Sequence, residues 1–423
     1  MKKVLLLAYQ VSPTKGSEFS VAWNYIKYMS KDNQLIVLFG VSDEHLGEIN
    51  EMQEYLKKNI VKNVEFIAVH ANKKIERLNW LNRRGIFNYS FYIAFKEWQK
   101  QAYQEAKKII GDKEIDIIHC LGPIGYREPG FLWKLDKPYI WGPISGFNNV
   151  PLKMMSALPM IGKAKLGFRA IVNNLQMHFS KRVKKAIMRS DVLLAATSEN
   201  ADAIKKKFNK DAIVLAENAI HTEIGLVNNS KFSSEKINLI WIGSIDARKS
   251  LIILLKAISK IKNKNIILNV VGDGPLRANM QKFSEVNGIS DMVLWHGKVP
   301  RNKVYELLTT SHLNIITSVS EGNPTTIWEA MGVGVPTLSI DHCGMHDVLC
   351  EKCGIKIPVD NLNKIVNDIT AEIDRLQGNK NLLYELALGT IDCAKKYQWS
   401  ERVNFWEKMY DLAIENHAKK TKS

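Results

Sequence analysis

Short, continuously apolar runs rich in β-branched residues alternate with helix-length amphipathic stretches along most of the chain. The first series comprises residues 3–9, 34–39, 64–69, 115–120 and 192–197, and the second comprises residues 238–243, 265–272, 292–297, 313–317 and 336–340. Continuous apolar character is typical of parallel strands that are covered on both faces. The sequence therefore predicts the α/β class, with two doubly wound, Rossmann-like parallel sheets.

A polar stretch over residues 222–236 separates the two series and has the composition of a linker. We therefore predict a first domain over residues 1–230 and a second over residues 231–398. Residues 399–423 begin with apolar side chains at helical spacing, which predicts a last helix that returns to the first domain. Because ligands of open parallel sheets collect beyond the strand ends, we expect a cleft between the domains.

The net charge of +16 favours an acidic partner, which could be nucleic acid, an anionic membrane or a phosphorylated small molecule. The chain has no zinc-finger spacing, RNA-binding segment or basic region feeding a heptad, so we expect no nucleic-acid partner. The first apolar run is too short for a signal peptide, and no run approaches the ~18 apolar residues of a spanning helix. These features predict a cytoplasmic protein.

The five cysteines are an odd, sparse set, which predicts a reducing compartment rather than a disulfide framework. Cys350 and Cys353 have the spacing of a metal or redox pair. No second pair or histidine cluster with ligand spacing accompanies them. We therefore expect a structural role for this pair, and no metal site.

The segment over residues 320–336 follows an apolar strand and predicts a turn, a helix and a further strand. Asn323 is suited to the N-cap and Pro324 to the first helical position. The free amides at the start of such a helix attract a phosphate or a sugar oxygen, so Gly322 to Thr325 are candidate binding residues.

Two acidic residues flank this candidate anion site. Glu321 directly precedes the predicted helix, and Glu329 lies roughly 8 Å along its axis from its start. Carboxylates repel phosphate but accept hydrogen bonds strongly from hydroxyl groups. A ligand with hydroxyl groups at both ends and phosphates between them is a nucleotide sugar.

The Glu321 and Glu329 spacing, followed by Ala-Met-Gly-Val-Gly-Val-Pro, resembles the signature of glycosyltransferase family 4. The resemblance extends to Gly243-Ser-Ile-Asp-Ala-Arg-Lys-Ser250, Val271-Gly-Asp-Gly-Pro-Leu276 and His296-Gly-Lys-Val299, and covers about residues 237–345. It implies a retaining, nucleotide-sugar-dependent transferase of the GT-B fold. Expected acceptors are glycans or lipid-linked sugars of cell-surface polysaccharide biosynthesis.

Carried over residue by residue, the resemblance implies that Arg248 and Lys249 hold the donor diphosphate. It implies that Glu321 meets the donor sugar and that Glu329 binds the ribose. Gly243 belongs to the same donor loop. Two cations stabilise a departing diphosphate as its charge grows, so we expect no cofactor and no divalent metal.

The sequence departs from the family pattern at two positions. Ser250 and Cys343 stand where the family usually has glycine. These departures leave the local loop geometry and the choice of donor open.

Two features of the first domain are also candidates. Gly16 lies in a loop that opens a helix, where it would let the backbone approach a phosphate or the acceptor; a plain strand-to-helix turn is the alternative. His119 lies at a strand end, where the resemblance implies a catalytic or sugar-contacting role. A hydrogen-bonded core histidine is the other interpretation.

Residues 151–190 contain nine basic residues, no acidic residue and several interleaved apolar side chains. Such a block could lie on an anionic membrane, which suits a lipid-linked acceptor and peripheral attachment to the inner face of the plasma membrane. A solvated helix face is the alternative.

Two further functions fit a similar fold. A sugar-nucleotide epimerase shares this architecture, and a noncatalytic nucleotide-sugar-binding protein could retain it. The two glutamates and the two cations favour transfer.

Overall fold

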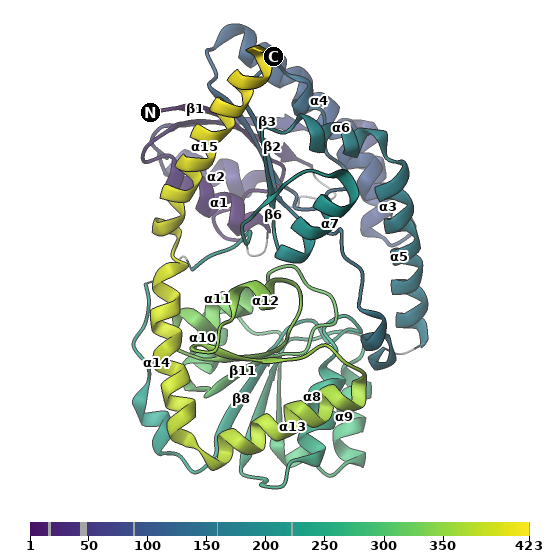
Figure 1. Cartoon of the computed structure of the whole chain (residues 1–423), viewed down its shortest axis with the longest axis vertical. Coiled ribbons are helices and arrows are strands. Elements are labelled where there is room, and N and C mark those ends of the chain that lie inside the picture. The colour runs from purple at the N-terminus through teal and green to yellow at the C-terminus, as the bar shows by residue number, and fades with distance from the viewer. Residues whose placement is uncertain (16–17, 43–48, 88, 159, 221–222, 423) are drawn as a thin grey trace. The chain divides into compact units, whose positions relative to one another are not determined.

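The computed structural model describes residues 1–15, 18–42, 49–87, 89–158, 160–220 and 223–422. It contains two compact units, each built on a parallel sheet with helices packed on it (Figure 1). Unit 1 comprises residues 1–148, 174–217 and the chain from Trp399 on, and unit 2 comprises residues 149–173 and 218–398. The predicted α/β class with two Rossmann-like parallel sheets is confirmed.

The units differ from the expected boundary near residue 230 in two places. Residues 218–230 lie in unit 2, where the Gly225 amide donates to the Gly332 carbonyl at 2.8 Å. Residues 149–173 also lie in unit 2, because Met154 and Leu158 are part of its core. Polar composition indicates exposure, and it does not show which neighbours a segment packs against.

Unit 1 contains a seven-stranded sheet in the order β3-β2-β1-β4-β5-β6-β7. Its strands are β1 (Lys3–Ala8), β2 (Gln34–Val41), β3 (Val64–His70), β4 (Ile117–Gly122), β5 (Tyr139–Ile144), β6 (Val192–Ala195) and β7 (Ile213–Val214). Its helices are α1 (Glu18–Met29), α2 (Ile49–Lys58), α3 (Lys73–Arg83), α4 (Ser90–Asp112), α6 (Lys181–Arg189), α7 (Ser198–Phe208) and α15 (Trp399–Lys422). Helix α5 (Met160–Phe179) is divided between the units.

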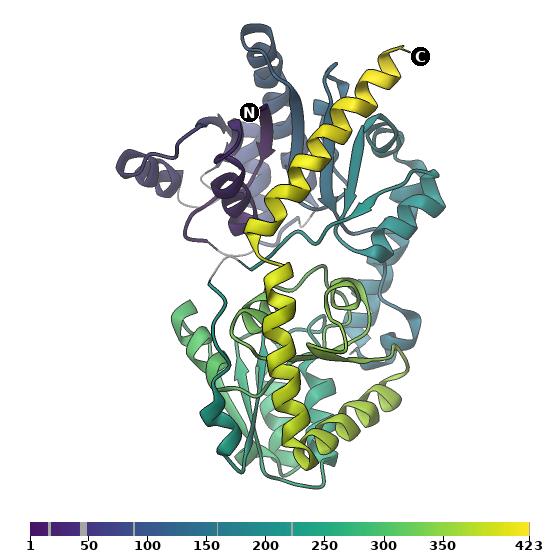
Figure 2. The same ribbon diagram turned by 60° about the vertical axis from the view of Figure 1, so that its left-hand side comes forward.

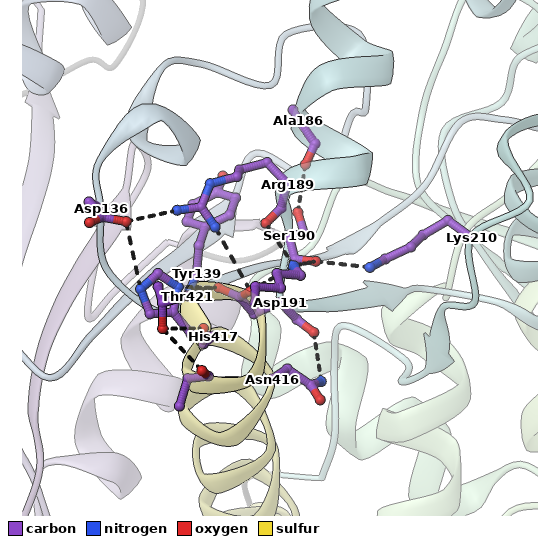
Figure 3. Close-up of polar contacts among 12 residues, drawn as sticks. Asp136, Tyr139, Ala186, Arg189, Ser190, Asp191, Lys210, Asn416, His417 and Thr421 are labelled. Atoms are coloured by element: carbon purple, nitrogen blue, oxygen red, sulfur yellow. Dashed lines mark hydrogen bonds and ion pairs between the residues drawn. The ribbon is translucent and has the colours of Figure 1, made fainter. Parts of the chain in front are cut away.

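The last helix, α15, packs against α1 and strands β4, β5 and β6 of unit 1 (Figure 2). Asp191, directly before β6, anchors its C-terminal half (Figure 3). The fully buried Asp191 carboxylate accepts from the Tyr139 amide at 2.9 Å and pairs with Lys420 Nζ at 2.7 Å and His417 Nδ1 at 3.3 Å. A buried carboxylate needs such partners to offset the loss of water.

Unit 2 contains a six-stranded sheet in the order β10-β9-β8-β11-β12-β13. Its strands are β8 (Ile237–Ile242), β9 (Ile266–Val271), β10 (Val293–Gly297), β11 (Leu313–Ile316), β12 (Thr337–Ile340) and β13 (Gly354–Ile357). Its helices are α8 (Leu251–Lys260), α9 (Arg277–Val286), α10 (Arg301–Thr310), α11 (Thr325–Gly332), α12 (Cys343–Val348), α13 (Leu362–Gly378) and α14 (Lys380–Lys396).

Candidate functional site

The order of strands in unit 2 reverses between the neighbours β8 and β11. Ligands of open parallel sheets bind beyond the carboxyl ends of strands at such a reversal. The loop after β8 carries Gly243, Arg248 and Lys249, and the loop after β11 carries Glu321 to Pro324. The structure therefore brings most of the predicted donor residues to the place where this fold binds ligands.

Hydrogen bonds join these two loops to each other and to strand β8. The Val319 amide donates to the Arg248 carbonyl at 2.8 Å, and the Thr317 hydroxyl donates to the Lys249 carbonyl at 3.0 Å. The buried Trp241 indole in turn donates to the Thr317 hydroxyl at 3.0 Å. The backbone of the two cations is thus fixed to the core of unit 2.

Glycines allow the neighbouring loop to pack closely. Gly272 has a φ of +129°, and a Cβ there would lie 1.9 Å from the Gly243 carbonyl oxygen. A Cβ on Gly274 would lie 2.6 Å from the Ile245 carbonyl oxygen. Only glycine fits such contacts. The loop after β9 therefore packs directly on the backbone of the Gly243 loop and supports it.

Arg248, Lys249 and Glu321 form one charge cluster. A single oxygen of Glu321 lies 2.8 Å from Arg248 Nη1 and 2.7 Å from Lys249 Nζ. Burial of Glu321 opposes its ionisation, but Lys249 and Arg248 outweigh this effect and hold the pKa of its carboxyl below the usual value. With two cations and one carboxylate, the cluster carries a net charge of about +1 and remains attractive to an anion.

Helix α11 begins one residue later than predicted. Pro324 is its N-cap, with φ −63° and ψ 132°, and Thr325 is its first residue. The expectation that Asn323 caps the helix was therefore wrong, because Pro324 keeps an extended ψ. Gly344 explains the close packing here, since a Cβ on it would lie 2.5 Å from the Gly322 carbonyl oxygen.

The two departures from the family pattern adopt backbone conformations that favour glycine. Ser250 has a φ of +49° and Cys343 a φ of +52°. Both values lie in the left-handed region, which side chains disfavour. The two loops thus keep a conformation that glycine takes readily, although neither residue is glycine.

Glu329 lies in a separate pocket of unit 2. Arg301, Tyr305, Thr325 and Trp328 are among its lining residues. Arg301 Nη2 donates to Glu329 Oε1 at 3.2 Å. Burial raises the pKa of the Glu329 carboxyl, and Arg301 offsets only part of that rise.

Arg301 and Tyr305 are residues that sequence reasoning missed. Arg301 opens α10, two positions beyond Val299, where the family-like stretch ends. The signal that could have found it is the strand end that precedes it, because residues after parallel strands gather at one edge of the sheet. Thr325 connects this pocket to the start of α11.

His119 lies in the core of unit 1. Its side chain is fully buried, with Nε2 donating to the Gly142 carbonyl at 3.0 Å and Nδ1 accepting from the Tyr25 hydroxyl at 2.9 Å. Burial lowers its pKa to about 4, although the Gly142 carbonyl acts in the opposite direction. Because both nitrogens are bonded within the core, His119 matches the alternative of a hydrogen-bonded core histidine, and its catalytic role stays a prediction.

Gly16 lies outside the described residues. Its expected part in binding phosphate or acceptor therefore stays a prediction.

Residues 226–376 match the family model described as glycosyl transferases group 1. A phosphatidylinositol N-acetylglucosaminyltransferase subunit of Arabidopsis thaliana is 24% identical over 43% of this chain and 41% of its own length. The lipopolysaccharide 1,6-galactosyltransferase of Salmonella typhimurium is 27% identical over 28% of this chain and 36% of its own length. The chain thus spans about half the length of the curated relatives it matches, or less.

Solved structures resemble the chain over nearly all of its length. The lipopolysaccharide outer core galactosyltransferase WaaB superposes with a TM-score of 0.61 at 15% identity, covering 96% of this chain and 98% of WaaB. HepE of Anabaena, in complex with UDP and glucose, superposes with a TM-score of 0.61 at 11% identity and covers 97% of this chain and 100% of its own. Residues 226–376 thus resemble glycosyl transferases group 1, and the chain has the GT-B fold of these solved structures, as its resemblance to family 4 implied.

Proposed function

We propose that the chain is a retaining glycosyltransferase that moves a sugar from a nucleoside-diphosphate sugar to a glycan or lipid-linked acceptor in polysaccharide biosynthesis. The observation that carries the proposal is the cluster of Arg248, Lys249 and Glu321 at the strand-order reversal of unit 2. The group 1 family match over the same residues supports it.

In this proposal Arg248 and Lys249 bind the donor diphosphate, together with the amides of Gly322, Asn323 and Thr325. The negative charge of the diphosphate grows as the glycosidic bond breaks, and two fixed cations stabilise that charge without reorganising. Glu321, which already lies between the cations, faces the sugar from the same position. Transfer by this arrangement needs no divalent metal at the donor, so adding Mg²⁺ or Mn²⁺ after chelation should leave the rate unchanged.

Glu329 is assigned to the opposite end of the donor. Its pocket combines a carboxylate with the aromatic side chains Trp328 and Tyr305. Carboxylates accept hydrogen bonds from ribose hydroxyls, and aromatic walls suit a nucleoside. When the ribose binds, the hydrogen bond from Arg301 to Glu329 would break, or Glu329 would accept from Arg301 and a ribose hydroxyl together.

A screen of nucleotide sugars tests this function. Donor binding should raise the melting temperature in proportion to the logarithm of donor concentration over its dissociation constant. The donor that binds is then incubated with the chain, and its products distinguish a transferase from an epimerase and from a noncatalytic binding protein. Glycosyl transfer or slow hydrolysis supports a transferase, an epimerised donor identifies the rival activity, and binding without turnover identifies a noncatalytic protein.

The basic and apolar side chains over residues 151–190 support a lipid-linked acceptor. Helix α5 exposes Phe168, Ile171, Leu175 and Phe179 at successive helical spacings, with Lys165 and Arg169 beside them. An exposed apolar stripe with basic neighbours is typical of helices that lie in an anionic membrane surface. No helix among the described residues has the length and apolar character to cross a bilayer.

Vesicle sedimentation tests this attachment. The chain should sediment with anionic vesicles at low salt and be released by high salt, because the attraction is screened. Replacing Phe168 and Leu175 by serine should weaken sedimentation, whereas the matched change at the exposed Val286 on α9 should not. Equal sedimentation with neutral vesicles would leave the segment as solvated surface.

A further inference from the structure

Three of the five cysteines meet in unit 2. Cys350 and Cys353 lie in the turn between α12 and β13, and Cys393 lies on α14. Cys350 Sγ is 3.7 Å from Cys353 Sγ and 3.4 Å from Cys393 Sγ, and the three sulfurs lie within 4.8 Å of one another. Among the described residues, no other group of three or more potential metal ligands is this close.

The backbone is arranged to hold the turn against α14. A Cβ on Gly389 would lie 2.0 Å from the Lys352 carbonyl oxygen, so only glycine allows this approach. The next residue, Thr390, donates its hydroxyl to the Cys353 carbonyl at 3.5 Å. These contacts lie one helical turn before Cys393 and set the distance between α14 and the cysteine pair.

We propose that Cys350, Cys353 and Cys393 bind one thiophilic divalent metal ion of the zinc class. Zinc lies ~2.3 Å from each thiolate in a tetrahedral site, which places the sulfurs about 3.8 Å apart. The two short sulfur separations are close to that value. The cysteine pair alone predicted a structural role, but the third sulfur comes from 43 positions beyond Cys350 and changes that interpretation.

The surroundings suit three thiolates with one open position. Cys350 is exposed while Cys353 and Cys393 are buried, so a water or another external ligand can complete the tetrahedron. The Cys350 amide points to Cys353 Sγ at 3.5 Å, and the positive charge of Lys396 acts on Cys393. Thiolates accept such hydrogen bonds, which stabilise and orient metal ligands.

A metal here would join the turn before β13 to α14. Since metal binding to a folded site adds to folding stability, the ion should stabilise unit 2. The inference does not rest on the proposed transferase function, and metal content can be measured without a donor or acceptor.

Cobalt titration of the full chain tests the site. The protein, without an affinity tag that binds metal, is reduced, treated with chelator and titrated anaerobically with Co²⁺. We expect one ion per chain, a thiolate-to-cobalt charge-transfer band and visible bands of tetrahedral intensity. Zinc should displace the cobalt and raise the melting temperature.

Variants locate the ligands. Cys393→Ser, which keeps the pair, and Cys350→Ser, which changes an exposed side chain, should each weaken binding by at least about tenfold. Cys120→Ala removes a buried cysteine of unit 1 and should retain one ion per chain. Binding by Cys393→Ser at wild-type affinity, or no cobalt spectrum with wild type, would overturn the proposal. The proposal would also be overturned if the reduced chain bound no metal and two of the three cysteines were instead oxidised by air to a disulfide.

Discussion

Single residues of the proposed donor site are assigned distinct roles from their positions. Glu321 contacts both Arg248 and Lys249, whereas Glu329 lies in a separate pocket with Arg301. An interaction made equally in the ground and transition states changes KM, and one made only in the transition state changes kcat. The two carboxylates should therefore fail differently when neutralised.

We predict that Glu329→Gln mainly raises the donor KM, by about tenfold or more, and that Glu321→Gln mainly lowers kcat by about a hundredfold. Steady-state kinetics with the identified donor measures both constants, and circular dichroism confirms folding. A loss of kcat alone in Glu329→Gln, with a loss of donor affinity alone in Glu321→Gln, would reverse the assigned roles.

Ser250 provides a test of backbone strain in the donor loop. A side chain in the left-handed region costs roughly 1–2 kcal/mol, so Ser250→Gly should be more stable than Ser250→Ala by about that amount. Ser284 in α9 is the matched control, because it is also buried and donates to a backbone carbonyl. There, in a helix, glycine should be less stable than alanine by about 1 kcal/mol. Denaturant unfolding measures the stability of the glycine and alanine variants at both positions. If alanine were the more stable at Ser250 as well as at Ser284, backbone strain at Ser250 would be refuted.

His119 should make the stability of unit 1 dependent on pH. Its folded pKa of about 4 lies below the unfolded value of 6.5, so the unfolded chain binds a proton first as the pH falls. Stability is lost from pH 6.5 down to about 4, by up to about 3 kcal/mol. His119→Gln should flatten this part of the profile, whereas His70→Gln, at an exposed position, should not. An unchanged slope in His119→Gln would contradict the burial of a neutral imidazole.

At the scale of elements, the last helix depends on a buried carboxylate. Asp191 fixes α15 to unit 1 through its side chain, and its carbonyl accepts from Asn416 Nδ2 at 3.0 Å (Figure 3). Asp191→Ala should lower the free energy of unfolding by about 3 kcal/mol, because it leaves buried donors without their acceptor. Asp136→Ala, at a side chain 85% exposed, should cost less than about 1 kcal/mol. Equal losses in thermal unfolding would show that the buried contacts do not hold the helix.

The sequence predicted most of the buried strands, but β5 (Tyr139–Ile144) and the edge strands β7 (Ile213–Val214) and β13 (Gly354–Ile357) were not among the predicted runs. Gly142 and Pro143 interrupt the apolar run of β5, and β7 is only two residues long. Helix α11 was predicted to begin at Pro324, but it begins at Thr325. The capping preferences of Asn323 and Pro324 gave the position to within one residue, and the extended ψ of Pro324 moved it. Local patterns therefore gave element type better than element ends.

At the scale of the whole molecule, the proximity of the loops after β8 and β11 was predictable, because parallel strands bring distant motifs to one edge of the sheet. Arg248 and Glu321 are 73 positions apart, yet the order of strands makes them neighbours. Cys393 was not predictable in this way. Its contact with the cysteine pair depends on how α14 packs, and helix packing leaves no fixed spacing in a sequence.

The most direct test of the proposed function measures the rate at which the chain releases nucleoside diphosphate from a nucleotide sugar. The rate is compared between wild type and two matched lysine variants. Lys249→Gln removes a cation 2.7 Å from Glu321, and Lys260→Gln removes an exposed cation that ends α8. Wild type and Lys260→Gln should release the diphosphate at the same rate, while Lys249→Gln should lose about a hundredfold or more in kcat/KM. Release by Lys249→Gln at the wild-type rate, or no release from any nucleotide sugar, would contradict a donor site at this cluster.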